Sequence, residues 1–358
     1  MQPEGLDALR ERIRELDRAL VALAAERVVV ARQVGEAKRR ADQPIVDYAQ
    51  ERVVLERARD AANAAGLDAR VAEAILVTLI RAAVSAQDQD SWRRASVGLG
   101  KTAVVVGGEG RMGRWFTRFL ADQGYVTGAL DIRSSGDEHA WAQAALPSAD
   151  LVVCSTPPAA TAALSDGWIA SPPSGVIVDI ASIKTPLIDP IRRLQAAGAS
   201  VASIHPMFGP SVVLLRDCDV VVCDTGDRAA TDAVVQLFTS TTARLLDLPL
   251  EEHDRLMADV LTLAHATVIA FALALPDTPV PVRSTTLGAL ETLSASLMRE
   301  SPDVYYEIQA LNPNSAGALD RLAGAIARVR AAVGSHDAEA FRSLMEEGRE
   351  KTMTGIGE

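Results

Sequence analysis

Cysteine, aromatic residues and basic residues are all scarce in this sequence, and each shortage excludes a class of protein. Of 358 residues, three are cysteine and 4% are aromatic. Cys154, Cys218 and Cys223 lie in or beside apolar runs and lack metal-ligand spacing, so we expect reduced core thiols and no metal site. Lys and Arg number 36 against 47 Asp and Glu, a formal charge of −11, which argues against a nucleic-acid-binding surface. Any anionic ligand would have to be bound by a few cations inside a pocket.

Long hydrophobic runs are also lacking. The first residues, MQPEGLDALRERIREL, contain no apolar signal core. The longest nearly uncharged run, residues 260–276, is shorter than the ~20 residues that a membrane-spanning helix needs. We therefore expect a cytoplasmic protein without a membrane partner. The length and the 48% hydrophobic content allow two or three domains, each with its own core.

The first third of the sequence predicts three helices. Apolar residues recur at heptad a and d positions from Leu6 to Ala37, which predicts one helix of about 35 residues that ends before Pro44. A second helix is expected at 48–65 and a third at 68–89. The polar stretch at 91–100 reads as a linker, so an all-helical domain is placed at 1–90.

Arg27 occupies a heptad a position, where the pattern requires an aliphatic residue. One explanation is a register-setting polar residue in a plain coiled coil. The other is a ligand site. Lys38 lies about three turns and ~16 Å further along the helix at nearly the same angular position, so two long cationic side chains could bracket a small dianion.

The helical third resembles the AroQ-type chorismate mutases over residues 5–90. The carrying segments are LRERIRELD, AERVVVARQVGEAK and PIVDYAQER, together with the last helix. The resemblance implies that Arg10 and Arg27 bind the two carboxylates of chorismate, that Lys38 and Gln87 bind its ether oxygen, and that Glu51 with the Asp47 backbone binds its C4 hydroxyl. Cations preorganised around the breaking C–O bond suit this pericyclic reaction. Gln50 and Ala83 stand where the family usually has arginine and serine.

The spacing of the two arginines predicts a dimer. Arg10 and Arg27 are seventeen residues apart, roughly 25 Å along one helix and on different faces. One chain cannot easily direct both side chains at one ligand, so we expect a second subunit to supply Arg10. The mutase family forms an intertwined dimer of this kind.

The middle of the chain predicts a dinucleotide-binding fold. The stretch TAVVVGGEGRMGRWFTRFLADQGYVTGALD reads as a strand, a glycine turn, a helix and a second strand. In this context Gly108 would permit the tight turn, Gly110 the approach of the pyrophosphate, and Gly113 close packing of helix and strand. Arg111 and Met112 complete the predicted cofactor turn.

Asp131 follows the second strand, 23 residues after Gly108. A carboxylate at this position accepts hydrogen bonds from the adenosine ribose and repels a 2′-phosphate, so NAD is favoured over NADP. Arg133 moderates that preference. Later strands predict a mostly parallel sheet within a Rossmann domain at 101–247. The crevice at the carboxyl ends of its strands should gather the cofactor-binding residues Ser155, Thr156 and Pro157, as well as Ser182 and His205.

From Lys101 onward the chain resembles the prephenate dehydrogenases, through VVVGGEGRMGR, VVCSTPP, VDIASIKTP, SIHPMFGP and EEHD. The resemblance implies that His205 accepts a hydrogen bond or proton from the C4 hydroxyl of prephenate, as suits histidine at neutral pH. Ser182 would orient His205, and Lys184 would add positive potential near the carboxylates. His253 would contact the substrate or orient its neighbours, and His265 would pack or orient.

A helical domain is expected at 248–358, with helices at 251–275, 285–300, 302–333 and 336–353. The apolar run VLTLAHATVIAFALAL predicts a helix buried between two subunits. The dehydrogenase family places an arginine six residues before the SP of MRESPDVYYEI, where it binds the ring carboxylate, and this chain has Ser296. Arg299 and Arg283 are the candidate substitutes, because a guanidinium forks onto a carboxylate.

The whole arrangement resembles the bifunctional chorismate mutase–prephenate dehydrogenases of tyrosine biosynthesis, with NAD as the cofactor. Three alternatives stay open at this point. Both reactions could use 4-amino-4-deoxy analogues, the second domain could use arogenate, whose ammonium group suits a less basic pocket, or an inactive second domain could sense NAD or tyrosine. Feedback by tyrosine would have to act at the active site or at a domain interface.

Overall fold

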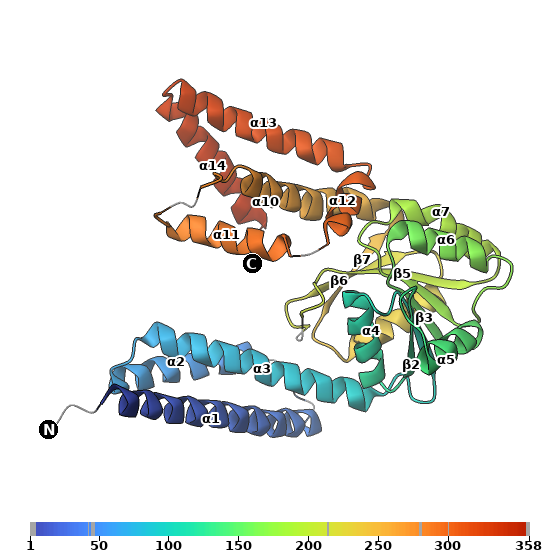
Figure 1. Ribbon diagram of the computed structural model, residues 1–358, viewed down its shortest axis with the longest axis horizontal. Helices are drawn as coiled ribbons and strands as arrows, with labels where there is room; N and C mark the ends of the chain where they lie inside the picture. The colour runs from blue at the N-terminus through green and yellow to red at the C-terminus, as the bar shows by residue number, and fades with distance from the viewer. Residues whose placement is uncertain are drawn as a thin grey trace. The chain divides into compact units, whose positions relative to one another are not determined.

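The chain forms two compact units in the structure, a computed structural model. The first unit contains Met1–Thr156, Gly167–Ile180 and Arg193–Asp247, and the second contains Pro157–Asp166, Ala181–Arg192 and Leu248–Glu358. The predicted order of an all-helical part, an α/β part and a second helical part is confirmed (Figure 1). The structure describes residues 5–41, 43, 47–212, 215–278, 281–299 and 301–355.

Three helices make up the helical segment of the first unit: α1 (Leu6–Arg40), α2 (Tyr48–Ala65) and α3 (Ala69–Ala95). Both α1 and α2 pack against α3 (Figure 1). The bounds predicted for α1 and α2 are confirmed, and α2 ends where Gly66 adopts a left-handed conformation with φ of 70°. Helix α3 ends at Ala95, six residues later than expected.

The extra residues of α3 are held by packing rather than by helix propensity. Trp92 is 4% exposed, and its ring meets Phe119 edge to face with ring centres 5.2 Å apart. The stretch that reads as a linker in the sequence is therefore helical as far as Ala95. Its polar residues cover the outer face of a helix whose inner face is buried.

A seven-stranded sheet forms the centre of what we call the sheet segment, which consists of the residues of the first unit between 101 and 247. The spatial order is β2-β1-β3-β4-β5-β6-β7. Strands β1 to β5 are parallel, and β6 runs antiparallel to β5, so the predicted mostly parallel sheet is confirmed. The strands are β1 (Thr102–Val106), β2 (Val126–Leu130), β3 (Leu151–Cys154), β4 (Val176–Asp179), β5 (Ser200–Pro206), β6 (Asp219–Asp224) and β7 (Arg244–Pro249).

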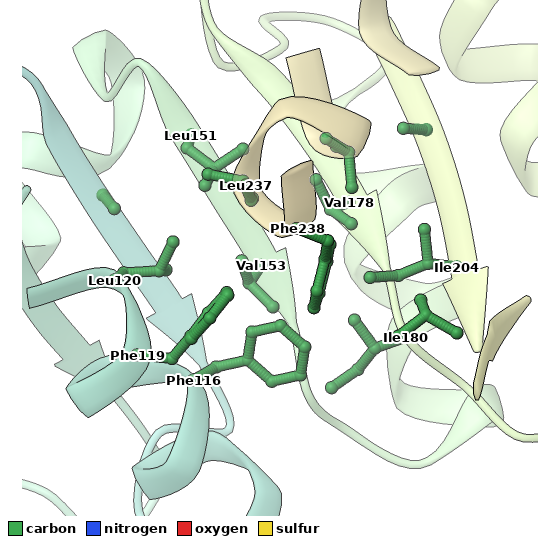
Figure 2. Packing of buried hydrophobic residues seen from close by; sticks show 14 of the residues in the cluster. Phe116, Phe119, Leu120, Leu151, Val153, Val178, Ile180, Ile204, Leu237 and Phe238 are labelled. Atoms are coloured by element: carbon green, nitrogen blue, oxygen red, sulfur yellow. The ribbon is translucent and has the colours of Figure 1, made fainter. Parts of the chain in front are cut away.

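The core of the sheet segment is an aromatic cluster between strands and helices. Figure 2 shows Phe116 and Phe119 of α4 (Arg111–Asp122) meeting Phe238 of α8 (Arg228–Thr239) over the aliphatic side chains of the central strands. The rings of Phe119 and Phe238 stack with centres 5.2 Å apart. The remaining helices between strands are α5 (Asp137–Ala145), α6 (Pro158–Trp168) and α7 (Ile188–Ala196).

The second unit is mostly helical, and its helices differ from the predicted ones in two places. The single helix predicted at 302–333 is two, α12 (Pro302–Ala310) and α13 (Ser315–Gly334), because Pro313 forces Asn312 out of the helical conformation. The helix predicted at 285–300 ends earlier. The other helices are α9 (His253–Met257), α10 (Leu263–Leu273), α11 (Thr285–Leu297) and α14 (Ala338–Gly355).

One helical stretch of the second unit, Leu250–Leu273, is long and apolar enough to cross a membrane by length and composition, and 22% of its most apolar window is buried. The prediction from the sequence considered only the nearly uncharged run at 260–276 and therefore did not include the helical residues before it, which contain charged side chains. Core helices of soluble proteins pass the same test. The stretch is interrupted by a π-helical turn, Ala258–Thr262, and its first turns contain buried His253 and Asp254.

Removal of the Trp92 side chain tests whether α3 is anchored in the aromatic core. We expect Trp92→Ala to cost about 3–5 kcal/mol of stability, because it leaves a cavity beside Phe119. The measurement is the midpoint of thermal unfolding. Trp141→Ala is the control, since Trp141 is 41% exposed; an equal loss in both variants would contradict the anchoring.

Candidate functional site

The helical segment brings several of the predicted residues together. The Lys38 ammonium lies 3.5 Å from the Asp47 carboxylate. Asp47 precedes α2 and accepts a hydrogen bond from the backbone N–H of Gln50, which holds the pKa of Asp47 below its ordinary value. Arg27 Nη1 is buried and makes no hydrogen bond to any residue that the structure describes. Arg27 as a whole is half-buried, and a buried guanidinium nitrogen without a partner is costly, so this position is suited to an anionic ligand.

Gln87 is held by a close approach of α3 to α1, which the sequence did not predict. Its side chain is 7% exposed, and its Nε2 donates to the backbone carbonyl of Ala31 in α1. Gly35 makes room for it, because a Cβ at position 35 would lie 2.7 Å from Gln87 Cδ. Gly35 is therefore a residue that sequence reasoning missed, although a lone glycine inside a helix was the available signal.

Glu51 has a partner that sequence reasoning also missed. Arg216, from the connection between β5 and β6, donates to both carboxylate oxygens of Glu51, with Nη1–Oε1 2.7 Å and Nη2–Oε2 3.0 Å. The hydrogen bonds to Glu51 raise the pKa of Arg216 above its ordinary value. The two residues are 165 positions apart, and no local pattern links them.

Arg10 lies far from this cluster along α1. Its side chain is 63% exposed and lies 3.5 Å from Asp7. The expectation that a second subunit supplies Arg10 stays a prediction.

In the glycine turn of the sheet segment, one predicted task falls to a different glycine, whereas the close packing predicted at Gly113 is present. The left-handed residue is Gly107, with φ of 81°, so the tight turn lies one residue before the position predicted for it. Gly108 is required because a Cβ there would lie 2.5 Å from Ala129 Cβ, and Gly113 because its Cβ would lie 2.2 Å from Gly107 O. Helix α4 begins directly after Gly110, with Arg111, Met112 and Gly113 in its first turn.

The carboxylate predicted to bind the ribose is ion-paired. Asp131 follows β2, its side chain is 8% exposed, and it accepts from Arg133 Nε at 3.0 Å. Hydrogen bonds from the Arg133 guanidinium hold the pKa of Asp131 below its ordinary value. A cavity of about 920 Å³ lies beside this pair, lined among others by Arg133 and Ser134. Ser155 and Thr156, which follow β3, are half-buried, and Pro157 is exposed.

His205 lies in β5, opposite Val221 of β6, and is 4% exposed. On the neighbouring strand, Asp179 ends β4 at 3% exposure and accepts a hydrogen bond from Ser203 Oγ at 2.9 Å. Burial, followed by the Asp179 charge, raises the pKa of the Cys154 thiol. Asp179 is a buried ionisable residue of the VDIAS segment that sequence reasoning did not single out.

The second unit collects a separate polar cluster around Asp254. This carboxylate accepts hydrogen bonds from the backbone N–H of Lys184 at 2.8 Å and of Thr185 at 2.7 Å, and it contacts His253 Nδ1 at 2.7 Å. Burial raises the pKa of Asp254, yet these hydrogen bonds bring it below its ordinary value. Asp254 thus orients His253. Sequence reasoning did not single out Asp254, although it is the last residue of the EEHD segment.

The other predicted residues of the second unit are found in varied surroundings. The Lys184 side chain is fully buried, whereas Ser182 is half-buried. His265 packs edge to face on Tyr305 with ring centres 4.7 Å apart, and burial lowers its pKa. Asn312, at 3% exposure, donates to the Asp254 carbonyl at 2.7 Å.

The candidate substitutes for the missing arginine are not preformed as a clamp. Arg299 lies beyond the end of α11 and is exposed, so it does not sit on the same helix as Ser296, as was expected. Arg283 is 62% exposed and its guanidinium is paired with Glu291 of α11. Neither guanidinium is held ready for a carboxylate within the second unit.

Across the described ranges, no group of three or more His, Cys, Asp or Glu side chains is placed to hold a metal ion. The three cysteines are free thiols, with Cys154 and Cys223 buried and Cys218 half-buried.

Comparison with known proteins gives a family match for each segment of the first unit. Residues 9–88 match the family model of chorismate mutase type II, and residues 124–247 match that of the prephenate dehydrogenase nucleotide-binding domain. The T-protein of Enterobacter agglomerans is 31% identical over 297 residues, 82% of this chain and 76% of that protein. The 4-amino-4-deoxyprephenate dehydrogenase of Streptomyces pristinaespiralis is 31% identical over 266 residues, 69% of this chain and 89% of that protein.

Solved structures agree on the fold. Prephenate dehydrogenase from A. aeolicus, crystallised with hydroxyphenyl propionate and NAD+, superimposes with a TM-score of 0.55 at 16% identity. The likeness covers 71% of this chain and 98% of that one. At this identity it establishes the architecture of the sheet segment and the helices that follow it.

Filling the space beside Gln87 tests its role in the helical segment. In Gly35→Ala the better helix propensity of alanine, worth up to about 1 kcal/mol, is opposed by the clash of the new methyl group with buried Gln87. The substitution should also push Gln87 aside and lower chorismate turnover by up to about 100-fold, since small misplacements of a catalytic group are costly. Gly324→Ala, in α13 with open space around its Cβ, is the matched control. Unchanged turnover in Gly35→Ala would contradict the assignment.

Asp131 can be tested through coenzyme preference. Asp131→Ser removes the carboxylate that is predicted to bind the ribose, and it releases Arg133 to bind a 2′-phosphate. We expect the ratio of kcat/KM for NADP over NAD to rise about 10-fold or more, the value of one charge-assisted hydrogen bond. Steady-state kinetics with both coenzymes measure this, with Asp137→Ser as the control. A ratio that does not rise would show that Asp131 does not face the ribose.

The helical segment therefore holds an Arg27 guanidinium nitrogen that is buried without a described partner, and the sheet segment holds a glycine turn that leads into a helix, followed by the mostly buried carboxylate of Asp131. NAD is the cofactor that these residues and the dehydrogenase family match support. The chorismate mutase match precedes the dehydrogenase match in the chain, and the likeness to the T-protein extends over 82% of the sequence. The chain belongs to the family of the T-proteins, the bifunctional chorismate mutase–prephenate dehydrogenases.

Proposed function

We propose that this chain converts chorismate to prephenate in its helical segment and then carries out the NAD-dependent oxidative decarboxylation of prephenate to 4-hydroxyphenylpyruvate. The observation that carries the proposal is the presence, in one chain, of the unpaired Arg27 guanidinium in the helical segment and the pyrophosphate-binding glycine turn in the sheet segment. Neither feature serves the other reaction. Two chemically distinct sites are therefore the simplest explanation.

In the mutase reaction, this chain's residues bind and orient chorismate without forming a covalent bond to it. Arg27, with Arg10 from a second subunit, would bind the two carboxylates. Lys38 and Gln87 would donate to the ether oxygen, where negative charge grows as the C–O bond breaks. Glu51 would accept the C4 hydroxyl, and the buried positions of Gln87 and Arg27 Nη1 support a site with little water.

In the dehydrogenase reaction, His205 would accept a hydrogen bond from the C4 hydroxyl of prephenate through an imidazole nitrogen. Bound NAD supplies the hydride acceptor. As positive character grows at C4, the hydrogen bond to His205 stabilises it until loss of CO2 makes the ring aromatic. Ser182 would share this network. Lys184 and the cluster of His253 and Asp254 would form the substrate side of the second unit, with Asp254 holding the histidine in place.

A homodimer in the cytoplasm is part of the proposal. In the described part of α1, the apolar side chains of the heptad stripe are exposed, which leaves a stripe suited to a second copy of the helix. The stripe consists of Leu6, Leu9, Ile13, Leu16, Leu20, Leu23, Val30 and Val34, each at least 45% exposed. Pairing through α1 would also allow Arg10 of one subunit to approach Arg27 of the other. Helix α10 exposes a further apolar surface, with Leu273 81% exposed.

A second candidate function is the same pair of reactions on 4-amino-4-deoxy analogues. The specific observation in its favour is the Streptomyces pristinaespiralis relative, which is as similar as the T-protein and of which this chain covers 89%. The absence of a preformed arginine clamp around α11 fits a changed substrate too. Arogenate, whose ammonium group suits surroundings with fewer cations, would fit the same absence of an arginine clamp among the described residues around α11.

The test is NADH formation by the full chain with prephenate, its 4-amino-4-deoxy analogue and arogenate in turn, beside consumption of chorismate. We expect prephenate to be oxidised and His205→Asn to lower that rate by about 100-fold or more, within the range for a lost acid or base. Chorismate turnover should persist in the variant. His336→Asn is the control, because His336 is exposed with φ of 53°, a conformation that asparagine tolerates.

Oxidation of the amino analogue in preference to prephenate would establish the second candidate function. Binding of NAD without turnover of any of the three substrates would refute the dehydrogenase half and leave a mutase that carries a sensing domain.

A further inference from the structure

Arg216 joins the two segments of the first unit at the predicted mutase site. It belongs to the short connection between β5 and β6, whereas Glu51 lies in the first turn of α2. The guanidinium and the carboxylate form two parallel hydrogen bonds of 2.7 and 3.0 Å. The side chains are 11% and 23% exposed, respectively. This pair is among the least exposed arginine–carboxylate pairs in the described part of the chain.

Further contacts hold the guanidinium of Arg216 in one orientation. Its central carbon lies 5.0 Å from the ring centre of Tyr48, a cation–π geometry. Its Nε lies 3.9 Å from the Asp217 carboxylate and makes no hydrogen bond to a described residue. Asp217 itself has φ of 63°, an uncommon conformation that turns the chain at this point. The arginine is thus enclosed between α2 and its own loop.

This enclosure restricts Glu51 as well. A carboxylate on a flexible side chain samples several rotamers, and a planar, bidentate guanidinium selects one of them. Each carboxylate oxygen can accept two hydrogen bonds, so both oxygens of Glu51 retain capacity to accept a hydroxyl while Arg216 is bound. The neighbouring turn contains Asp47, which contacts Lys38. Arg216 therefore fixes one acceptor in a cluster of mutase residues.

We propose that Arg216, a residue of the dehydrogenase segment, is a positioning residue of the mutase reaction: it holds the Glu51 carboxylate in the orientation that accepts the C4 hydroxyl of chorismate. This role rests on the proposed mutase function of the helical segment. It makes mutase turnover dependent on the loop that follows β5, the strand that carries His205. The helical segment is then incomplete as a mutase without the sheet segment.

The experiment compares Arg216→Ala and Arg216→Lys with wild type in the full chain. Arg216→Ala should lower mutase kcat/KM about tenfold, the value of roughly one hydrogen bond to a charged group. Arg216→Lys should recover part of the loss, because lysine keeps the positive charge but cannot form the two parallel hydrogen bonds of a guanidinium. Prephenate oxidation reports whether the variants are folded and should stay within about twofold of wild type. Thermal unfolding measures the stability that is lost with this mostly buried pair, because Glu51 is left without its partner.

Arg244→Ala is the matched control. Arg244 forms the same bidentate pair with Asp219 in the same region of the sheet segment, but its side chain is 70% exposed. Its removal should leave mutase kcat/KM unchanged. An equal loss in the control would mean that any broken ion pair in this region lowers turnover, and the proposal would be overturned.

A double-mutant cycle with Glu51→Gln separates positioning from a general effect on the fold. If Arg216 acts through Glu51, Arg216→Ala should cost little in the Glu51→Gln background. An undiminished loss in that background would overturn the proposal, as would a rise in mutase turnover in Arg216→Ala, which would show that the contact inhibits. Absence of chorismate turnover in wild type would instead refute the proposed mutase function, an outcome that the wild-type assay identifies before any variant is compared.

Discussion

The packing of Trp92 against Phe119 is the interaction on which the organisation of the first unit depends. It anchors the last turns of α3 in the aromatic core of the sheet segment. Gln87 lies five residues earlier on the same helix, about 7.5 Å away along its axis. Because a helix transmits displacement along its length, the core of one segment sets the position of a side chain in the predicted site of the other. The contact of Arg216 with Glu51 requires the same anchoring, since it too joins α2 to a loop of the sheet segment.

Two mostly buried carboxylates of this acidic protein, Asp254 and Asp131, are compensated by hydrogen bonds. Asp254 gathers two backbone N–H groups and a histidine, and Asp131 gathers the Arg133 guanidinium. Arg27 is the contrasting case, because its buried Nη1 has no hydrogen-bond partner among the described residues. Compensated groups are held in fixed orientations and preorganise a site. An uncompensated cation is the part of such a site that its ligand completes.

The exposed apolar surfaces have a related meaning. The heptad stripe of α1 is regular, yet its side chains are at least 45% exposed along the helix. Exposed apolar area of this extent is costly in water. Oligomerisation through α1 and α10 would remove it and would also supply Arg10 from a second subunit. Stability and mutase activity would then depend on the same contact.

The sequence by itself determined the local features of this protein. Heptad periodicity gave the bounds of α1, Gly66 ended α2, and the glycine turn between two β-branched runs located the cofactor site, because periodicity and backbone conformation depend on near neighbours in the chain. Asp131 and Lys38 were predicted from spacing for the same reason, whereas His205 was predicted from the resemblance of the SIHPMFGP segment to the dehydrogenases. Tertiary structure alone decided the rest. The helix beyond Gln89 forms because Trp92 is buried, Gly35 matters because another helix places Gln87 above it, and Arg216 meets Glu51 across 165 residues. Such contacts depend on which surfaces pack together, and that is a property of the whole fold and of no segment within it.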